Sequence, residues 1–592
     1  MKALLAASLL AAASVAAAQA PSASSTTPQQ ADALMALARV HGIVRYFHPS
    51  DAVETMKWNP FLVRAAERMG TVASASEIGP RLEEIYGPIV EGFRVVPVGT
   101  AITRPQGEGP IVEWRHLGYG IDTDAASPYV SWRTHYAPVA GGKVKGGFFQ
   151  HRGEAEAPVH AEPVMRVPVA AGLEAHVPVS LPLSAAKLSD ARKAKLEEFA
   201  AALDAVPMAG DEATRAQAHA DGIAAWNVAR HFYPYWDVVK VDWEAGLRPW
   251  LLRQPATLTR DQLRDSLRAL AEPLNDAQGE IADPRQLRNR AFLGISVRPA
   301  GERWVVDASL APDKIKPGDV VSAVGGKPAN AWFKERMALI SGSAQHKRWR
   351  ARYELTAGDK GETIAIRFTR GKESFEATLT YDQPRAVHEA RPAALQEVKP
   401  GIHYVDASRF DKAAFEKALE TMKDAKGVVF DLRGLPARDA VTLASHWVTR
   451  PDSAQWMFVP RIDRPGAMSS ASWSLGWNVG PNATLAKAKK VLLVDGRTVG
   501  YGESLAGYFP AHSTGPVVGA ASAGATGNIA IAPLPSGLGF IFTGMRVTRH
   551  DGKTPIHGKG FEPDTVVAPT LEGIRAGRDE ALDRAVEIAS GR

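Results

Sequence analysis

The chain has 592 residues, of which 45% are hydrophobic and 23% charged, and it contains no cysteine. This composition excludes a disordered or collagen-like protein, and the missing cysteine excludes disulfides, thiolate metal sites, iron–sulfur clusters and a cysteine nucleophile. A net charge of +6 is small for a chain long enough for three or four domains, and it argues against a nucleic-acid-binding protein.

The N-terminus has the pattern of an export signal. Met1-Lys2 gives a positive start, and residues 3–18 are all small or apolar. Two tripeptides, Ala16-Ala17-Ala18 and Ala18-Gln19-Ala20, have the small-x-small form of a cleavage site. We therefore predict a signal peptide over residues 1–20 and an exported protein, periplasmic or secreted. No later stretch has the roughly 18 apolar residues of a spanning helix, so we expect no stable membrane insertion.

A helical pattern occurs twice in the chain. Residues 39–49 and 224–234 both end in aromatic residues and a proline, and a tryptophan follows at the same spacing. The matching residues are Phe47, Pro49 and Trp58 in the first copy and Phe232, Pro234 and Trp243 in the second. The Ala-rich pattern before each proline predicts a duplicated helical unit, over residues 21–93 and 191–290. The polar aromatic side chains at the helix ends are expected to pack in the core.

The segment between the copies, residues 94–190, differs in character. Proline, glycine and valine dominate, and runs such as 129–133 and 175–179 alternate in polarity. This pattern predicts antiparallel strands in a small, β-rich sandwich.

Residues 291–384 resemble a PDZ domain. Phe292-Leu293-Gly294-Ile295 opens a strand, Gly318-Asp319 gives a tight turn before a buried strand, and Gly325-Gly326 reverses the chain. In this resemblance Phe292, Leu293, Gly294 and Ile295 form the carboxylate-binding loop and its strand. Such domains add an extended peptide to a sheet edge while backbone amides hold its C-terminal carboxylate. The resemblance implies a polypeptide partner, bound through its C-terminus.

A basic run, residues 346–352, lies inside this segment. Because charged runs usually cover a solvated helix face, we expect no partner for it.

The last segment, residues 385–592, alternates strand and helix patterns. Strands are predicted at 401–405, 426–432 and 491–494, and helices at 410–422, 440–448 and from Glu503 onward. This order predicts a largely parallel α/β sheet with its functional edge at the strand C-termini. The strand–turn–helix ending at Glu503 suits a nucleophile, because the start of a helix offers free N–H groups to an oxyanion.

The order of these motifs resembles peptidase family S41, the tail-specific or C-terminal processing proteases. The resemblance covers residues 210–592 and rests on the PDZ-like segment, 428–434, the turn before Glu503, 519–527 and 557–564. It implies an α+β multidomain protein with a crotonase-like, largely parallel peptidase core and a polypeptide substrate. The duplicated helical unit is similar to exported members from Gram-negative bacteria.

The catalytic positions that the resemblance implies are occupied in this chain by residues that cannot perform the family's chemistry. The serine nucleophile of the family lies three residues before the glutamate, and that position is Gly500. A lysine base, in one branch, would fall on Ala525, and the histidine of a Leu-x-Asp-x-His motif, in the other, on Gln278. Glycine has no attacking atom, and glutamine cannot accept a proton near neutral pH.

Other residues near these positions could substitute. Ser504 and Ser522 are candidate nucleophiles, although a helix-cap or exposed hydroxyl is the simpler interpretation of Ser504. Three histidines, His446, His512 and His557, are close in sequence, and His557 is expected to be a surface or structural residue. Backbone amides around Gly434, Gly500 and Tyr501 would remain as an oxyanion-type site.

No metal or cofactor motif occurs. The 16 histidines form no His-Glu-x-x-His pair, no carboxylates have calcium-loop spacing, and the Gly-rich segment 515–527 lacks the end of a phosphate-binding loop. Two functions remain open: an exported serine peptidase with an unorthodox serine, or a catalytically inactive pseudopeptidase that binds or scaffolds peptides.

Overall fold

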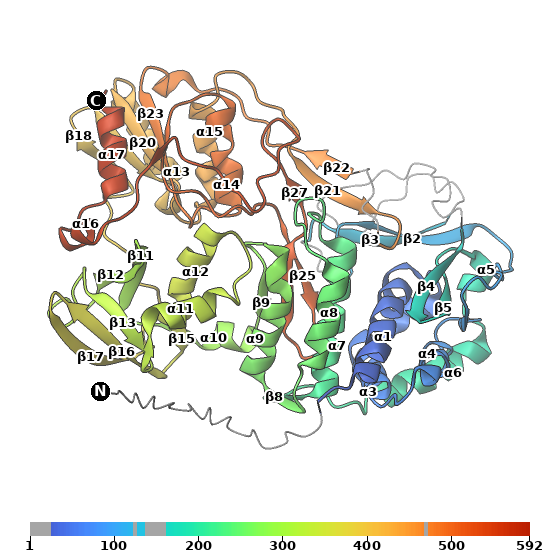
Figure 1. Cartoon of the computed structure of the whole chain (residues 1–592). Coiled ribbons are helices and arrows are strands. Elements are labelled where there is room, and N and C mark those ends of the chain that lie inside the picture. Colours follow the sequence, from blue (N-terminus) through green and yellow to red (C-terminus); the bar gives the residue numbers. More distant parts are fainter. Residues whose placement is uncertain (1–24, 122–126, 136–161, 467–471, 592) are drawn as a thin grey trace, which may run out of the picture.

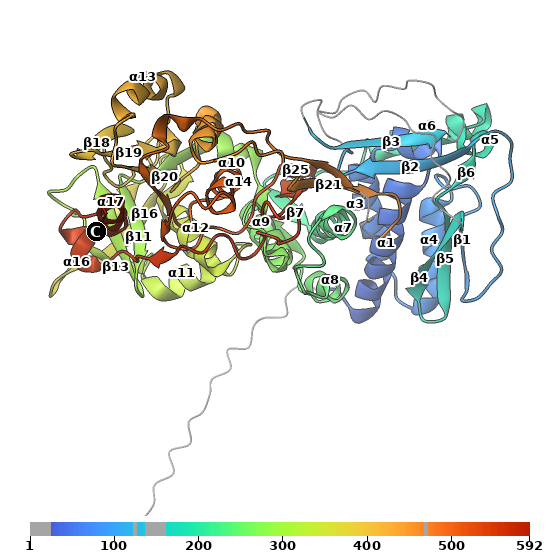
Figure 2. The ribbon, with the colours of Figure 1, turned by 90° about the horizontal axis from the view of Figure 1, so that it is seen from above.

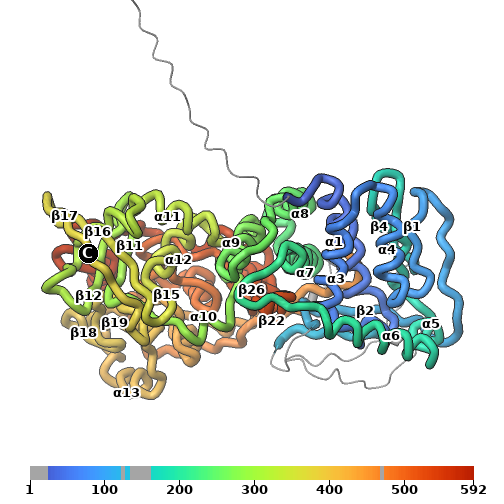
Figure 3. The backbone as a smooth tube through the Cα atoms, turned by 90° about the horizontal axis from the view of Figure 1, so that it is seen from below, coloured from blue at the N-terminus to red at the C-terminus, as the bar shows by residue number. Residues whose placement is uncertain are grey.

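The structure is a computed structural model that describes residues 25–121, 127–135, 162–466 and 472–591. The predicted signal peptide lies outside these residues. A helical region and a region with a curved antiparallel sheet lie at opposite ends of the molecule, and an α/β region packs above the sheet (Figure 1). The view from above shows the same two ends (Figure 2), and the backbone tube seen from below agrees (Figure 3).

The helical region comes from both copies of the repeat. Its first part contains α1 (Pro28–Phe47), α2 (Asp51–Thr55), α3 (Trp58–Met69), η1 (Ala75–Glu77) and α4 (Ile78–Tyr86). Its second part contains α6 (Asp190–Leu203), β7 (Glu212–Thr214), α7 (Arg215–Phe232), α8 (Trp243–Leu252), β8 (Thr257–Thr259), α9 (Arg260–Ala271), η2 (Glu272–Leu274) and α10 (Pro284–Asn289).

Local sequence explains why the long helices α1 and α7 begin and end as they do. Each begins with a capping box, in which Thr27 or Thr214 exchanges hydrogen bonds with a glutamine three residues on. Each ends just before a proline, which cannot continue a helix. The two helices pack on each other, and the aromatic and histidine side chains at their ends are buried, including Tyr46, His48 and Tyr233.

The strands of residues 94–182 form two sheets. The first has the order β1 (Arg94–Pro97), β5 (Leu173–Pro178), β4 (Val164–Ala170). The second joins β2 (Ile111–Leu117), β3 (Val130–His135) and β6 (Leu181–Pro182), followed by α5 (Leu183–Ala186), to β21 (Met457–Ile462), β22 (Ser472–Leu475) and β27 (Arg546–Val547).

The prediction of a self-contained sandwich is therefore wrong. Strand β2 pairs with β21, from the last third of the chain, through His116 opposite Ile462. The buried Arg115 on β2 also forms an ion pair with Asp463, which follows β21, at 3.5 Å. An arginine buried this deeply needs a carboxylate close by, so this segment and the C-terminal region fold onto each other.

The curved sheet at the other end is antiparallel, with the order β11-β12-β13-β16-β17 and β14 beside β13. Its strands are β11 (Ile295–Ala300), β12 (Arg303–Ser309), β13 (Val320–Val324), β14 (Lys327–Pro328), β16 (Thr363–Arg370) and β17 (Glu373–Thr380). Beside it lie α11 (Ala329–Met337), α12 (Ala344–Thr356) and the two-stranded pair β10 (Arg290–Phe292) and β15 (Ala357–Asp359). Because these elements come from the middle of the sequence, we call them the central sheet region.

The basic run 346–352 lies on α12 and is not a solvated face. His346, Trp349 and Arg352 are buried, and Arg350 forms an ion pair with Glu280 at 2.7 Å. The expectation fails because α12 packs between the central sheet and the rest of the protein, where Glu280 pairs with Arg350 and Glu272 pairs with Lys347.

The C-terminal region has a six-stranded sheet of order β18-β19-β20-β23-β24-β28, parallel except for β18. Its strands are β18 (Leu395–Lys399), β19 (Ile402–Asp406), β20 (Gly427–Asp431), β23 (Lys489–Val494), β24 (Val517–Gly519) and β28 (Thr565–Val566). Its helices are η3 (Ala407–Arg409), α13 (Lys412–Met422), η4 (Arg438–His446), η5 (Ala483–Leu485), α14 (Tyr501–Ala506), α15 (Tyr508–Ala511), α16 (Leu571–Arg575) and α17 (Glu580–Ala589). The predicted helix over 440–448 is a 3-10 helix, η4.

A small antiparallel sheet connects the regions. It contains β25 (Ile529–Pro533), β26 (Gly539–Thr543) and β9 (Glu280–Ala282), with β26 in the middle. Because β9 begins two residues after Gln278, its pairing with β26 connects the end of the second helical copy to the C-terminal core.

Among the residues that the structure describes, no helix is both long and apolar enough to cross a membrane.

Candidate active site

Gly500 occupies a backbone turn that other residues avoid. It caps the N-terminus of α14 with φ of 60° and ψ of −123°. A β carbon at this position would lie 2.7 Å from Oε1 of Gln278, closer than van der Waals contact allows. Glycine is therefore the residue that fits, both for the backbone angle and for the space.

Gln278 is held against Gly500 by a set of polar contacts. Its Nε2 donates to the Gly527 carbonyl and to Oγ1 of Thr543, both at 3.0 Å. The buried Asp276 accepts hydrogen bonds from the backbone amide of Gln278 and from the hydroxyl and backbone amide of Thr543. The fold thus places the predicted base position beside the predicted nucleophile position, but neither side chain has acid–base or nucleophilic chemistry.

Glu503 anchors the Gly-rich loop 519–527 to the start of α14. Its carboxylate accepts hydrogen bonds from the amides of Gly524 and Ala525, both at 2.7 Å, and from the Ser522 hydroxyl. Burial raises the pKa of Glu503 to about 8, although these hydrogen bonds favour its charged form.

Ser522 and Ser504 are both buried and engaged. Ser522 donates to Glu503, accepts from the Phe561 amide at 2.7 Å, and has no exposed surface. The Ser504 hydroxyl lies 2.7 Å from that of Thr526, whose own proton goes to the Gly500 carbonyl. Ser504 is therefore neither a cap nor an exposed hydroxyl, and neither serine is placed to attack a peptide bond.

Two of the three amides expected at an oxyanion site are free. Within the described residues, the N–H groups of Gly434 and Tyr501 have no hydrogen-bond acceptor, whereas that of Gly500 donates to the Ala525 carbonyl at 2.8 Å. Gly434 and α14 are close, because a β carbon on Gly502 would lie 3.6 Å from the Gly434 carbonyl oxygen. Free amides at such a place can bind a carbonyl oxygen.

The predicted carboxylate loop lies in the central sheet region. The backbone amides of Phe292 and Leu293 donate to the carbonyls of Gln383 and Thr356, respectively. Ile295 begins β11. The backbone amide of Gly294, unlike those of Phe292 and Leu293, has no hydrogen-bond acceptor within the described chain. Among the residues that the structure describes, no hydrogen bond joins this loop to Gly500.

The link between the central sheet region and Gly500 is the start of α12, which the sequence did not indicate. Ser343 donates its hydroxyl to the Ala523 carbonyl at 2.6 Å, and Gln345 donates to the Ser522 carbonyl at 2.8 Å. The loop that Glu503 holds from one side is therefore also held by α12.

The three nearby histidines are structural. His557 is buried, stacks on Tyr235 at 4.0 Å and lies 2.7 Å from the Tyr233 hydroxyl. His446 packs against Phe415, and His512 contacts Asp452. Among the contacts of the described residues, none joins these rings to Gly500 or Gln278.

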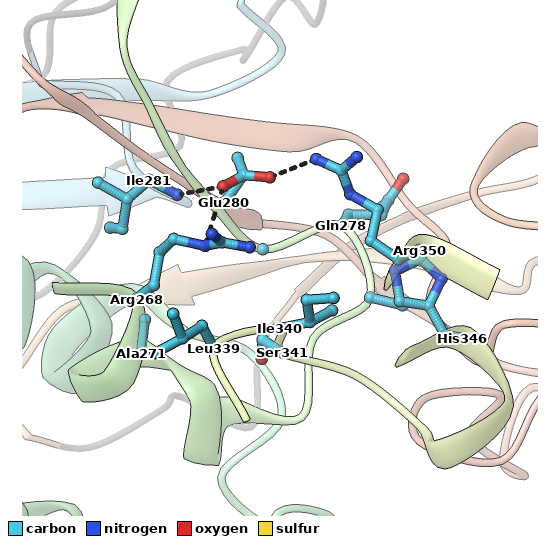
Figure 4. A pocket seen from close by; sticks show the side chains of 12 residues that line it. Arg268, Ala271, Gln278, Glu280, Ile281, Leu339, Ile340, Ser341, His346 and Arg350 are labelled. Atoms are coloured by element: carbon cyan, nitrogen blue, oxygen red, sulfur yellow. Dashed lines mark hydrogen bonds and ion pairs between the residues drawn. The ribbon is translucent and has the colours of Figure 1, made fainter. Parts of the chain in front are cut away.

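A cavity of about 230 Å³ lies beside Gln278. Figure 4 shows Glu280 between Arg268 and Arg350 at one side of it, with Leu339 and Ile340 at the other. His346 also lines the cavity, and burial lowers its pKa to about 3, so the ring is neutral. The sequence did not point to this cavity, because its walls come from α9, β9 and α12.

Comparison with known proteins agrees with the fold of the core. The model of peptidase family S41 matches residues 401–567, which hold Gly434, Gly500 and Glu503. This segment is therefore an S41 peptidase-family segment, as the motif order predicted. No curated protein matches the chain.

Solved structures similar to this chain include S41 proteases. A mutant of CPAF is 12% identical, with a TM-score of 0.51, over 64% of this chain and 97% of that one. Mature CPAF complexed with lactacystin is also 12% identical, with a TM-score of 0.49, over 63% and 98%. The photosystem II D1 C-terminal processing protease is 18% identical, with a TM-score of 0.36, over 61% and 97%. The first likeness shows a shared fold.

We predict that Gly500→Ala lowers the free energy of unfolding by about 1–3 kcal/mol, because the methyl group meets both an unfavourable backbone angle and Gln278. Gly371→Ala is the matched control, since Gly371 has a φ of 62° but open space around it. Urea unfolding should show a smaller loss for Gly371→Ala, and partial recovery in Gly500→Ala combined with Gln278→Ala. Equal losses in all three variants would contradict the contact.

We also predict that Glu503 makes stability depend on pH. Its pKa is about 8 in the folded chain and ordinary in the unfolded chain, so the folded state binds the extra proton between these values. The free energy of unfolding should therefore fall as the pH rises from about 4.5 to about 8. Glu503→Gln should flatten this dependence in urea titrations, whereas Glu416→Gln, an exposed control, should retain it.

Proposed function

We propose that this protein is an exported, polypeptide-binding member of peptidase family S41 that holds an extended chain without forming a serine acyl-enzyme. The observation that carries the proposal is the pairing of Gly500 with Gln278. An acyl-enzyme needs an attacking atom and a group to take its proton, and this pair supplies neither.

Binding does not need the missing side chains. The free amides of Gly434 and Tyr501 would donate hydrogen bonds to a peptide carbonyl oxygen, as the corresponding groups do in an oxyanion hole. Next to Gly434, the Leu435 side chain is 69% exposed, an unusual exposure for leucine. An apolar side chain beside free amides suits an extended polypeptide, which offers both carbonyls and apolar groups.

The central sheet region would contribute as a PDZ-like domain. The free amide of Gly294 suits a C-terminal carboxylate, and the exposed Leu310 packs beside it. Because α12 hydrogen-bonds the loop 519–527, a peptide bound to the central sheet would act on the free amides near Gly500. Export is part of the proposal and rests on the N-terminal sequence pattern alone.

A second candidate function is peptide-bond hydrolysis. The match of residues 401–567 to family S41 favours it, because hydrolysis is the reaction that the family name describes. Hydrolysis would require Ser504 or Ser522 to leave its present hydrogen bonds and reach a peptide bound at the free amides of Gly434 and Tyr501.

Labelling with a fluorophosphonate probe separates the two functions. We predict no labelling of the natural chain and no cleavage of casein. Gly500→Ser combined with Gln278→His should gain labelling, because Asp276 lies where it can orient a histidine at position 278. Labelling of the natural chain that disappears in Ser504→Ala or Ser522→Ala would instead establish the peptidase.

Binding is tested with fluorescent peptides. We predict saturable binding of an extended peptide in anisotropy measurements, weakened about tenfold by Leu435→Asp through loss of apolar contact. Val98→Asp is the matched control, because Val98 is 62% exposed and lies far away in sequence at the end of β1. A peptide with an amidated C-terminus should bind less tightly than its free acid. Absence of binding by every peptide would exclude the proposed function.

A further inference from the structure

A second cavity lies at the other end of α14. Gly500 precedes this helix, and Gly507 follows it and lines a cavity of about 560 Å³. The remaining walls come from the segment 450–454, α15, the segment 549–551 and Phe561. Nothing in the family match or in the proposed function assigns a role to it.

A histidine pair on one aspartate stands in this cavity. Oδ2 of Asp452 lies 2.7 Å from Nε2 of His512 and 3.0 Å from Nδ1 of His550. All three side chains are at least nine-tenths buried. Among the described residues, no cluster of such groups is arranged to hold a metal ion.

The outer nitrogen of His550 has no partner. Its Nε2 is buried and makes no hydrogen bond within the described chain. The ring is fixed by stacking on Trp456, at 5.1 Å, and by the edge of Tyr508, at 4.3 Å. Gly507 lies beside Nε2, and a β carbon on this glycine would lie 3.4 Å from the atom. A buried, fixed and unpaired polar atom on a residue that lines a cavity indicates a ligand.

The cavity lining holds two arginines and two carboxylates, and both carboxylates already accept hydrogen bonds. The carboxylate of Asp452 already accepts from two histidines and from the Ala454 amide. That of Asp551 accepts from its own loop, through Lys553 and Thr554.

The two arginines of the cavity, unlike its carboxylates, keep their hydrogen-bonding groups available. Neither Arg450 nor Arg549 has an ion pair or a side-chain hydrogen bond in the described part of the chain. Arg549 lies over the ring of Phe561 at 5.3 Å, which orients its charge.

We propose that this cavity binds a small oxyanion, a phosphate or a carboxylate. Arg450 and Arg549 supply the charge, since guanidinium groups match the geometry of these anions. His550 donates from Nε2 only when its ring carries a second proton. Burial lowers the pKa of His550, whereas Asp452 on one side of the ring and a bound anion on the other favour that proton. The ligand occupies the space that Gly507 leaves open.

Isothermal titration calorimetry of the full chain with inorganic phosphate, and separately with succinate, tests the proposal. We expect saturable binding of at least one of them, and the tighter of the two names the class of anion. Arg549→Gln should weaken binding about tenfold or more, through loss of a charged hydrogen bond. Arg303→Gln, an exposed arginine on β12 outside the cavity, should bind as the natural chain does.

His550→Asn refines the test. Asparagine can still donate to Asp452 from the place of Nδ1 but has no group at the place of Nε2, so we expect binding to weaken while thermal unfolding changes little. The absence of binding of both anions would overturn the proposal. Binding that Arg549→Gln leaves unchanged would also overturn it.

Discussion

The contact between Gly500 and Gln278 is the constraint on which the candidate site depends. The backbone angle at residue 500 disfavours a side chain, and the Gln278 oxygen 2.7 Å from the missing β carbon would have to move for one to fit. Gln278 is fixed in turn by Thr543 and Gly527, so the end of the second helical copy, the turn before α14 and strand β26 meet at one point. The turn that would present a nucleophile is retained, and the space before it is closed.

Polar groups, more than apolar packing, connect the regions around this point. Glu503 holds the loop 519–527 from α14, and Ser343 and Gln345 hold it from α12. A buried carboxyl group is tolerated here because backbone amides and a hydroxyl bind its oxygens, although burial still raises its pKa. These contacts connect the central sheet region physically to the turn at Gly500, which a binding protein could use as well as a peptidase.

Much of the secondary structure could be predicted from local pattern. The two capping boxes and the prolines after Phe47 and Phe232 set the ends of α1 and α7, and the buried strands β20 and β23 follow from apolar runs. The prediction failed where distant segments meet. The insert does not close on itself because β2 pairs with β21, and the basic run on α12 is buried because carboxylates of other segments neutralise it.

The sequence alone determined which residues stand at the positions that the family resemblance assigns to the nucleophile and the base. These residues are Gly500 and Gln278, and the chain contains no cysteine that could replace the nucleophile. Only the tertiary structure decided which remaining groups are available. The sequence offered Ser504 and Ser522 as candidate nucleophiles, but hydrogen-bond partners from other turns of the fold bury and engage them, whereas the amides of Gly434 and Tyr501 stay open. Exposure and hydrogen bonding depend on packing between distant segments, which local sequence does not specify.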